Sequence, residues 1–165
     1  MNNEYYYISE EAMEIISPLA EIELEQSTFY NQLAVTANRL GFLMAQKYFN
    51  QEAVEEKEHF MGWVDYISGR GNNYTVPAIG ITKCKSKSLY ELIEMALAKE
   101  VEVSKLYAEQ GMKLFNVDQL AYQKLIGYLQ IQNEAIIFYT DLCAVFENLD
   151  KAGELTAEHS YFEEG

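Results

Sequence analysis

Residues 49–63 read FNQEAVEEKEHFMGW. Within this stretch Phe49, Glu56, His59 and Trp63 recur at intervals of three, four or seven residues, which places them on one face of an α-helix. Apolar residues stand at both ends of that face, but a carboxylate and an imidazole stand in its middle. An unpaired charge is costly to bury, so the segment predicts an amphipathic helix whose inward face carries a Glu-x-x-His pair that needs partners.

Three further segments repeat this arrangement. Each has an apolar stripe with spacings of three and four, interrupted near its middle by Glu23, Glu100 or Gln132. Four long amphipathic helices predict an all-α protein built as a four-helix bundle. The three stripes comprise Ile16, Leu19, Glu23, Gln26, Tyr30, Leu33, Ala37 and Leu40; Leu89, Ile93, Ala96, Glu100, Val103 and Tyr107; and Leu125, Leu129, Gln132, Ile136, Tyr139, Cys143 and Phe146.

The breaks between the stripes predict how the helices connect. Ser9 is a candidate N-cap for the first helix, and Pro18 either kinks that helix or starts it again with Ser17 as the cap. Gly41 marks the turn into the second helix. Residues 70–87 form a long non-helical stretch that can run the length of a bundle, so we expect it to join the second and third helices in parallel.

The C-terminal half completes the expected architecture. A short turn near Asn116 would join the third and fourth helices as an antiparallel hairpin. We expect one domain over residues 1–165, with the bundle at about residues 10–147. Residues 148–165 form a short acidic tail, where we expect a short, truncated fifth helix or only a tail.

Composition excludes several classes of function. The 165 residues contain 12 Lys and Arg against 26 Asp and Glu, a formal net charge of −14. Such a surface repels phosphate backbones and anionic lipids, so we expect neither a nucleic-acid nor a membrane partner. No signal-peptide pattern and no apolar run of about 20 residues is present, so the expected location is the cytoplasm. Two cysteines are too few for a disulfide framework; we expect Cys84 to be an exposed loop thiol and Cys143 to be buried.

The polar residues of the stripes predict a metal centre. A Glu-x-x-His pair on one helix, with one Glu from each of two other helices, is the set that holds two irons in bundle proteins. Carboxylates offset the repulsion between two divalent ions, and oxygen with imidazole donors suits iron better than a soft metal. We expect Glu23, Glu56 and His59 to hold the tighter iron, and Glu56, Glu100 and Gln132 the weaker one.

Three segments resemble the ferritins. The run Glu23-Leu-Glu-Gln-Ser-Thr-Phe-Tyr30 resembles their first helix, where a metal-binding Glu precedes a Tyr by seven residues. Residues 55–59 are similar to the ferritin Glu-Glu-x-x-His segment, and residues 88–92, which lead to Glu100, resemble the start of the third helix in bacterial ferritins. The similarity covers roughly residues 10–147.

The resemblance implies a bacterial-type, non-haem ferritin. Such a protein is a ferroxidase that oxidises Fe(II) with dioxygen or hydrogen peroxide and stores Fe(III) mineral inside a homo-oligomeric cage of 24 subunits. The matching positions of the ferroxidase centre are Glu23, Tyr30, Glu56, His59, Glu100 and Gln132.

Other positions match the family only in part. Lys57 stands where bacterioferritins have the methionine that binds haem, so we expect no haem. Glu55 and Glu134 match acidic residues of the third iron site of bacterial ferritins, and we keep them as candidate metal ligands. Ile131 and Ala135 do not match that site, so a three-iron centre is not supported.

Several alternatives stay open from the sequence alone. A different di-iron protein, such as a peroxide reductase that stores no mineral, would use the same ligands. An acidic bundle that only assembles or binds partners would leave Glu23 and Glu100 as solvated residues and Glu56 with His59 as a surface pair. Gln132 could be a core amide bonded to the backbone, because a short turn near Asn116 could shift its register.

Overall fold

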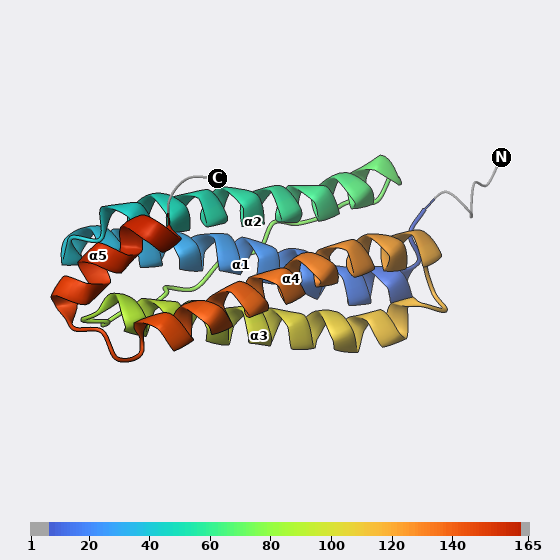
Figure 1. Ribbon diagram of the computed structural model, residues 1–165. Helices are drawn as coiled ribbons and strands as arrows, with labels where there is room; N and C mark the ends of the chain where they lie inside the picture. The colour runs from blue at the N-terminus through green and yellow to red at the C-terminus, as the bar shows by residue number, and fades with distance from the viewer. Residues whose placement is uncertain (1–6, 163–165) are drawn as a thin grey trace.

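The computed structural model describes residues 7–162. The described residues form four long helices and a short fifth one. The long helices lie side by side as a bundle, and the short helix lies across one end (Figure 1). The predicted all-α four-helix bundle with a short fifth helix is therefore confirmed. The helices are α1 (Glu10–Leu40), α2 (Leu43–Gly69), α3 (Leu89–Leu114), α4 (Gln119–Phe146) and α5 (Lys151–Tyr161).

The ends of α1 follow from a few side chains. The Ser9 hydroxyl accepts a backbone N–H at the start of the helix, as predicted for an N-cap. The helix continues through Pro18, so the alternative restart at Ser17 is wrong; the Ser17 hydroxyl donates instead to the carbonyl four residues earlier, at 2.7 Å. Gly41 ends α1 with a φ of 93°, a left-handed conformation that glycine adopts without a steric cost.

The link between α2 and α3 crosses the length of the bundle, as expected (Figure 1), so these two helices run in parallel. The predicted exposure of Cys84, on this link, and the predicted burial of Cys143, on α4, are both wrong. Cys84, on the link, is half-buried rather than exposed, because its Sγ lies 3.8 Å from Sδ of Met95 on α3. Cys143 is also half-buried, since its part of α4 lies at the margin of the core.

Two apolar clusters fill the bundle, one toward each end. One contains Tyr30, Phe49 and Tyr139, and the other contains Leu19 and Trp63. On every long helix the residues of the two clusters are separated by polar residues that are nonetheless buried. We use the name polar layer for five of these residues and the half-buried His59 on α2; the five are Glu23, Gln26, Glu56, Glu100 and Gln132. The stripe interruptions read from the sequence therefore lie at one level of the core.

Helix α5 joins the two helical hairpins at one end of the bundle. The carboxylate of Glu154 accepts the first two backbone N–H groups of α3, at 2.9 and 3.2 Å. Glu158, one turn later on the same face, accepts two N–H groups at the start of α2, at 3.1 and 3.2 Å. Helix N-termini carry unsatisfied donors and partial positive charge, so a buried carboxylate is stabilised there.

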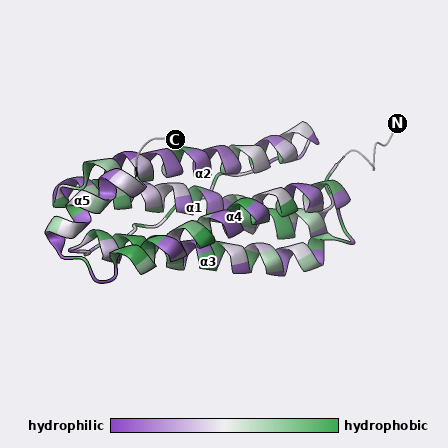
Figure 2. Ribbon diagram, in the orientation of Figure 1, coloured by the Kyte–Doolittle hydropathy of each residue, from purple (hydrophilic) through white to green (hydrophobic). Residues whose placement is uncertain are grey.

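The surface gives no sign of a membrane span. No helix between residues 7 and 162 combines the length and the apolar character needed to cross a bilayer. Figure 2 shows hydrophilic residues along much of α2, whereas hydrophobic and hydrophilic residues alternate along α4.

Removing the Glu158 carboxylate should loosen the start of α2. The side chain of Phe42, the residue before α2, makes no capping hydrogen bond, so nothing replaces the lost acceptor. We expect Glu158→Ala to cost about 2 kcal/mol of stability, the usual value for hydrogen bonds to a charged group. Thermal melting and hydrogen exchange at Met44 and Ala45 would measure it. Glu109→Ala, an exposed change on α3, serves as the control, and equal melting and exchange in both variants would contradict the expectation.

Candidate metal centre

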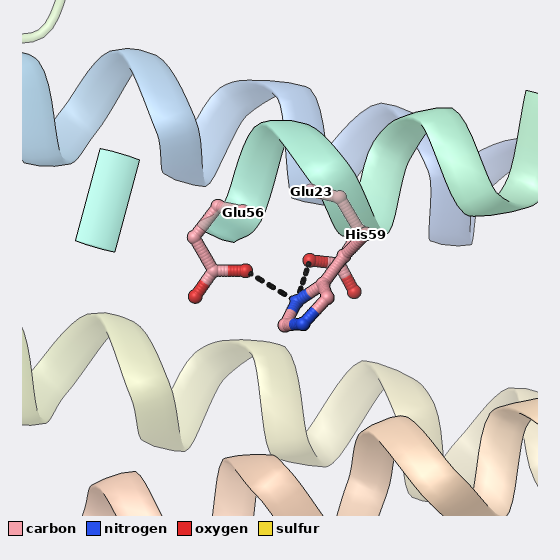
Figure 3. Close-up of side chains that lie close together, drawn as sticks. All are labelled: Glu23, Glu56 and His59. Atoms are coloured by element: carbon pink, nitrogen blue, oxygen red, sulfur yellow. Dashed lines mark hydrogen bonds and ion pairs between the residues drawn. The ribbon is translucent and has the colours of Figure 1, made fainter. Parts of the chain in front are cut away.

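The structure brings Glu23, Glu56 and His59 together in the polar layer (Figure 3). One ligand atom from each side chain lies within 4.8 Å of the others. Nδ1 of His59 is 3.0 Å from Oε2 of Glu56 and 3.5 Å from Oε2 of Glu23. These are the three residues that the sequence assigns to the tighter iron. Two come from one face of α2 because they are three residues apart, and Glu23 approaches them from α1.

Several buried side-chain atoms of the polar layer have no hydrogen-bond partner in the described residues. Oε2 of Glu23, Oε2 of Glu100 and Oε1 of Gln132 are buried and accept no hydrogen bond from the described part of the chain, and the side-chain amide of Gln26 also has no partner there. The Glu23 oxygen makes an ion-pair contact with His59. Buried acceptors in native proteins are nearly always satisfied, so unsatisfied oxygens from three helices require an external partner. A hard or borderline cation fits a set of carboxylates, one amide and one imidazole.

The raised pKa values in the polar layer also fit a cation site. Burial raises the pKa of Glu56, and it raises the pKa of Glu100 to about 7. Burial alone would lower the pKa of His59, but its contacts with Glu23 and Glu56 outweigh burial and raise it. The metal-free layer therefore keeps protons near neutral pH that a bound cation would displace.

The remaining predicted residues divide into buried and exposed groups. Gln132 is 1 % exposed, so the turn before α4 has not shifted its register out of the core. Tyr30 is fully buried and donates a hydrogen bond to Oε1 of Glu100. Glu55 and Glu134 lie on the exposed faces of their helices, outside the polar layer, and Glu55 accepts a hydrogen bond from the side-chain amide of Gln51 at 3.0 Å.

Tyr107 is a site residue that the sequence reasoning placed in the core stripe without assigning it a role. It is fully buried on α3, and its hydroxyl donates to Oε1 of Glu23. A signal was present, because Tyr107 follows Glu100 by seven residues, the same interval that separates Tyr30 from Glu23.

Two further neighbours of the cluster were not assigned to the centre either. The ring of Tyr128, on α4, lies against the imidazole of His59, with ring centroids 4.7 Å apart. Glu52 is half-buried one turn before Glu56, and burial, with the nearby Glu55 and Glu100 charges, raises its pKa to about 7. Helical spacing already places Glu52 beside Glu56, whereas Tyr128 could be found only by knowing how α2 and α4 approach each other.

Comparison with protein families gives one clear match. Residues 14–149 match the family model described as a ferritin-like domain. The chain is also 24 % identical over 148 residues to a probable bacterial non-heme ferritin-like protein of Haemophilus influenzae. That alignment covers 89 % of this chain and 88 % of the relative.

Solved structures share the fold at low sequence identity. An open-pore ferritin from the hyperthermophilic archaeon Archaeoglobus fulgidus superimposes with a TM-score of 0.88 at 21 % identity, covering 96 % of this chain and 98 % of that one. An engineered closed form of the A. fulgidus ferritin gives a TM-score of 0.85, also at 21 % identity and with the same coverage of both chains. At this identity the likeness shows the arrangement of the helices.

The metal-free protein should lose stability as pH rises through neutrality. Glu100 keeps its proton up to about pH 7 in the folded state but releases it near 4.5 when unfolded, so the folded state binds more protons between these values. Stability should therefore be fully present below about pH 4.5, as far as this group is concerned, and fall up to about pH 7. The raised pKa values of Glu56 and His59 extend the loss in the same direction.

Thermal melting of metal-free protein between pH 5 and 8 would measure this dependence. Glu100→Gln should make it shallower, since the amide does not titrate while Glu56 and His59 still do, and exposed Glu134→Gln should leave it as in the wild type. Stability that rises with pH over this interval would contradict the assignment of protons to the layer.

Proposed function

Because the chain belongs to the ferritin-like family, we propose that it oxidises Fe(II) at a di-iron centre within each subunit and stores the Fe(III) product as mineral in a protein cage. The observation that carries the proposal is the buried Glu23, Glu56 and His59 cluster with unsatisfied oxygens beside it. Iron is the substrate of this reaction, and dioxygen or hydrogen peroxide accepts its electrons.

The ligands are unequal, which supports two iron positions of different strength. Glu23, Glu56 and His59 offer two carboxylates and an imidazole to the first iron. Glu56 would be shared with a second iron that Glu100 and Gln132 complete. An amide oxygen is a weaker donor than a carboxylate, so the second position would hold its ion less tightly. Three carboxylates do not neutralise two divalent ions, and the remaining positive charge would stabilise the negative charge that oxygen gains on reduction.

The chain's own residues would prepare the centre for this reaction. The apolar clusters on both sides exclude water from the polar layer, which strengthens every electrostatic interaction within it. The hydroxyls of Tyr30 and Tyr107 hold Glu100 and Glu23 by one oxygen each, so the other oxygen of each carboxylate is available to metal. Arriving iron would displace the protons that burial keeps on Glu56 and Glu100.

The surface of α4 supports assembly with other copies. This helix exposes several large apolar side chains to solvent in the isolated chain, at 42–61 % of their full accessible area. Apolar residues repeated along one helix mark surfaces that bury themselves in an interface. The residues are Leu120, Ile126, Ile131 and Ile137. A closed cage of 24 subunits, as the family resemblance implies, would cover them.

Loss of a ligand should abolish fast oxidation. We expect Glu56→Ala and His59→Ala each to lower the initial rate of Fe(II) oxidation by more than about 100-fold, because even loss of an outer-shell partner costs 10- to 100-fold. Stopped-flow absorbance with two Fe(II) per chain would measure the rate. Glu58→Ala, an exposed change on the same helix, should oxidise iron as the wild type does. Wild-type rates in both ligand variants would refute the proposed site.

Particle mass and iron content together test the storage function. We expect light scattering to give the mass of 24 chains of 19.0 kDa each. We also expect aerobic loading to incorporate far more than two irons per chain. A small particle that turns over peroxide with only two irons per chain would instead establish the alternative, a non-storing di-iron peroxide reductase.

A further inference from the structure

A hydrogen-bonded chain of three buried side chains leads to the candidate metal centre. The indole Nε1–H of Trp63 donates to the hydroxyl of Tyr107 at 2.9 Å, and that hydroxyl donates to Oε1 of Glu23. All three side chains are fully buried, and they come from α2, α3 and α1 respectively. The family resemblance assigns no role to either Trp63 or Tyr107.

The chemistry of the indole fixes the direction of the chain. An indole nitrogen can only donate, so the Tyr107 oxygen must accept from Trp63. The tyrosine has a single hydroxyl proton, which is then directed at Glu23. Successive hydrogen bonds in a buried site polarise one another, so Trp63 strengthens the bond that Tyr107 makes to the carboxylate.

The two oxygens of Glu23 therefore have different roles. Oε1 accepts the Tyr107 proton, whereas Oε2 accepts no hydrogen bond and lies 3.5 Å from Nδ1 of His59. We infer that Trp63 and Tyr107 are a positioning pair that restricts Glu23 to binding a metal ion through Oε2 alone. This inference rests on the proposed metal centre and adds the residues that set how one of its ligands binds.

The same interaction occurs twice, and Trp63 reinforces one copy of it. Tyr30 lies seven residues after Glu23 and donates to Glu100, while Tyr107 lies seven residues after Glu100 and donates to Glu23. Each tyrosine can reach the glutamate of the other helix because α1 and α3 run in opposite directions (Figure 1). The chain has one tryptophan, Trp63, and its single N–H donates to Tyr107. Trp63 therefore acts on the orientation of Glu23 and not on that of Glu100.

Removal of the Tyr107 hydroxyl tests the inference without removing its ring. In Tyr107→Phe, Oε1 of Glu23 is free to join Oε2 on the metal. Co(II) is the probe, because the intensity of its visible absorption falls as its coordination number rises. We expect a weaker band for the first Co(II) bound and a loss of affinity of about 10-fold, as for other outer-shell partners of metal ligands.

Two further variants separate positioning from packing. Trp63→Phe should change the Co(II) spectrum in the same direction but less, and should add nothing when Tyr107 is already Phe, because Trp63 acts through Tyr107. Tyr66→Phe is the matched control: its ring also contacts Trp63, with ring centroids 6.3 Å apart, but its hydroxyl donates to Asp118 at 2.8 Å. This control should keep the wild-type spectrum.

The outcomes separate this inference from the proposed function. An unchanged Co(II) spectrum in folded Tyr107→Phe overturns the positioning role, and so does a full effect of Trp63→Phe in the Tyr107→Phe background. If circular dichroism shows that Trp63→Phe does not fold, Tyr107→Phe alone decides. Failure of the wild type to bind Co(II), or equal binding by Glu56→Ala, overturns the metal centre itself.

Discussion

The burial of Glu23, Glu56 and Glu100 with His59 between two apolar clusters is the constraint on which the rest of the structure depends. Carboxylates in such surroundings are costly unless they hold protons, accept hydrogen bonds or bind cations. The metal-free protein uses the first two means, with raised carboxyl pKa values and tyrosine donors, and it leaves one oxygen each of Glu23, Glu100 and Gln132 unsatisfied, as well as the amide of Gln26. Binding of a cation would satisfy the remaining buried oxygens, and cation binding is the basis of the proposed function.

The buried glutamates differ in whether the fold supplies donors for both of their carboxylate oxygens. This difference distinguishes glutamates that stabilise the fold from glutamates that could bind a ligand. Glu154 and Glu158 place their carboxylates on backbone N–H groups at the starts of α3 and α2, so their donors are supplied by the fold itself. Glu23 and Glu100 each have one oxygen held by a tyrosine and the other without a donor. A carboxylate that is fully satisfied stabilises the fold, whereas one that is half satisfied is arranged to receive a ligand.

The features that could be predicted from the sequence are those that depend on the periodicity of a single helix. The stripes placed Glu23, Glu100 and Gln132 in the core, and the three-residue spacing placed Glu56 beside His59. The sequence did not predict contacts that depend on how helices approach each other. The bond from Tyr107 to Glu23 requires the antiparallel register of α1 and α3, and the caps made by α5 require the return of a tail that sequence reasoning treated as truncated. Cys84 was placed wrongly for the same reason, because the path of the crossover over Met95 leaves no local pattern.

The position of iron can be found directly in a crystal of this protein soaked anaerobically with Fe(II) and measured at the iron absorption edge. We expect the strongest anomalous peak among Glu23, Glu56 and His59, with a weaker peak beside it toward Glu100 and Gln132. Density that shows Glu23 bound through Oε2, with Oε1 still on Tyr107, would support the positioning pair as well. Anomalous peaks only at exposed carboxylates, with the polar layer empty of iron, would contradict the central claim.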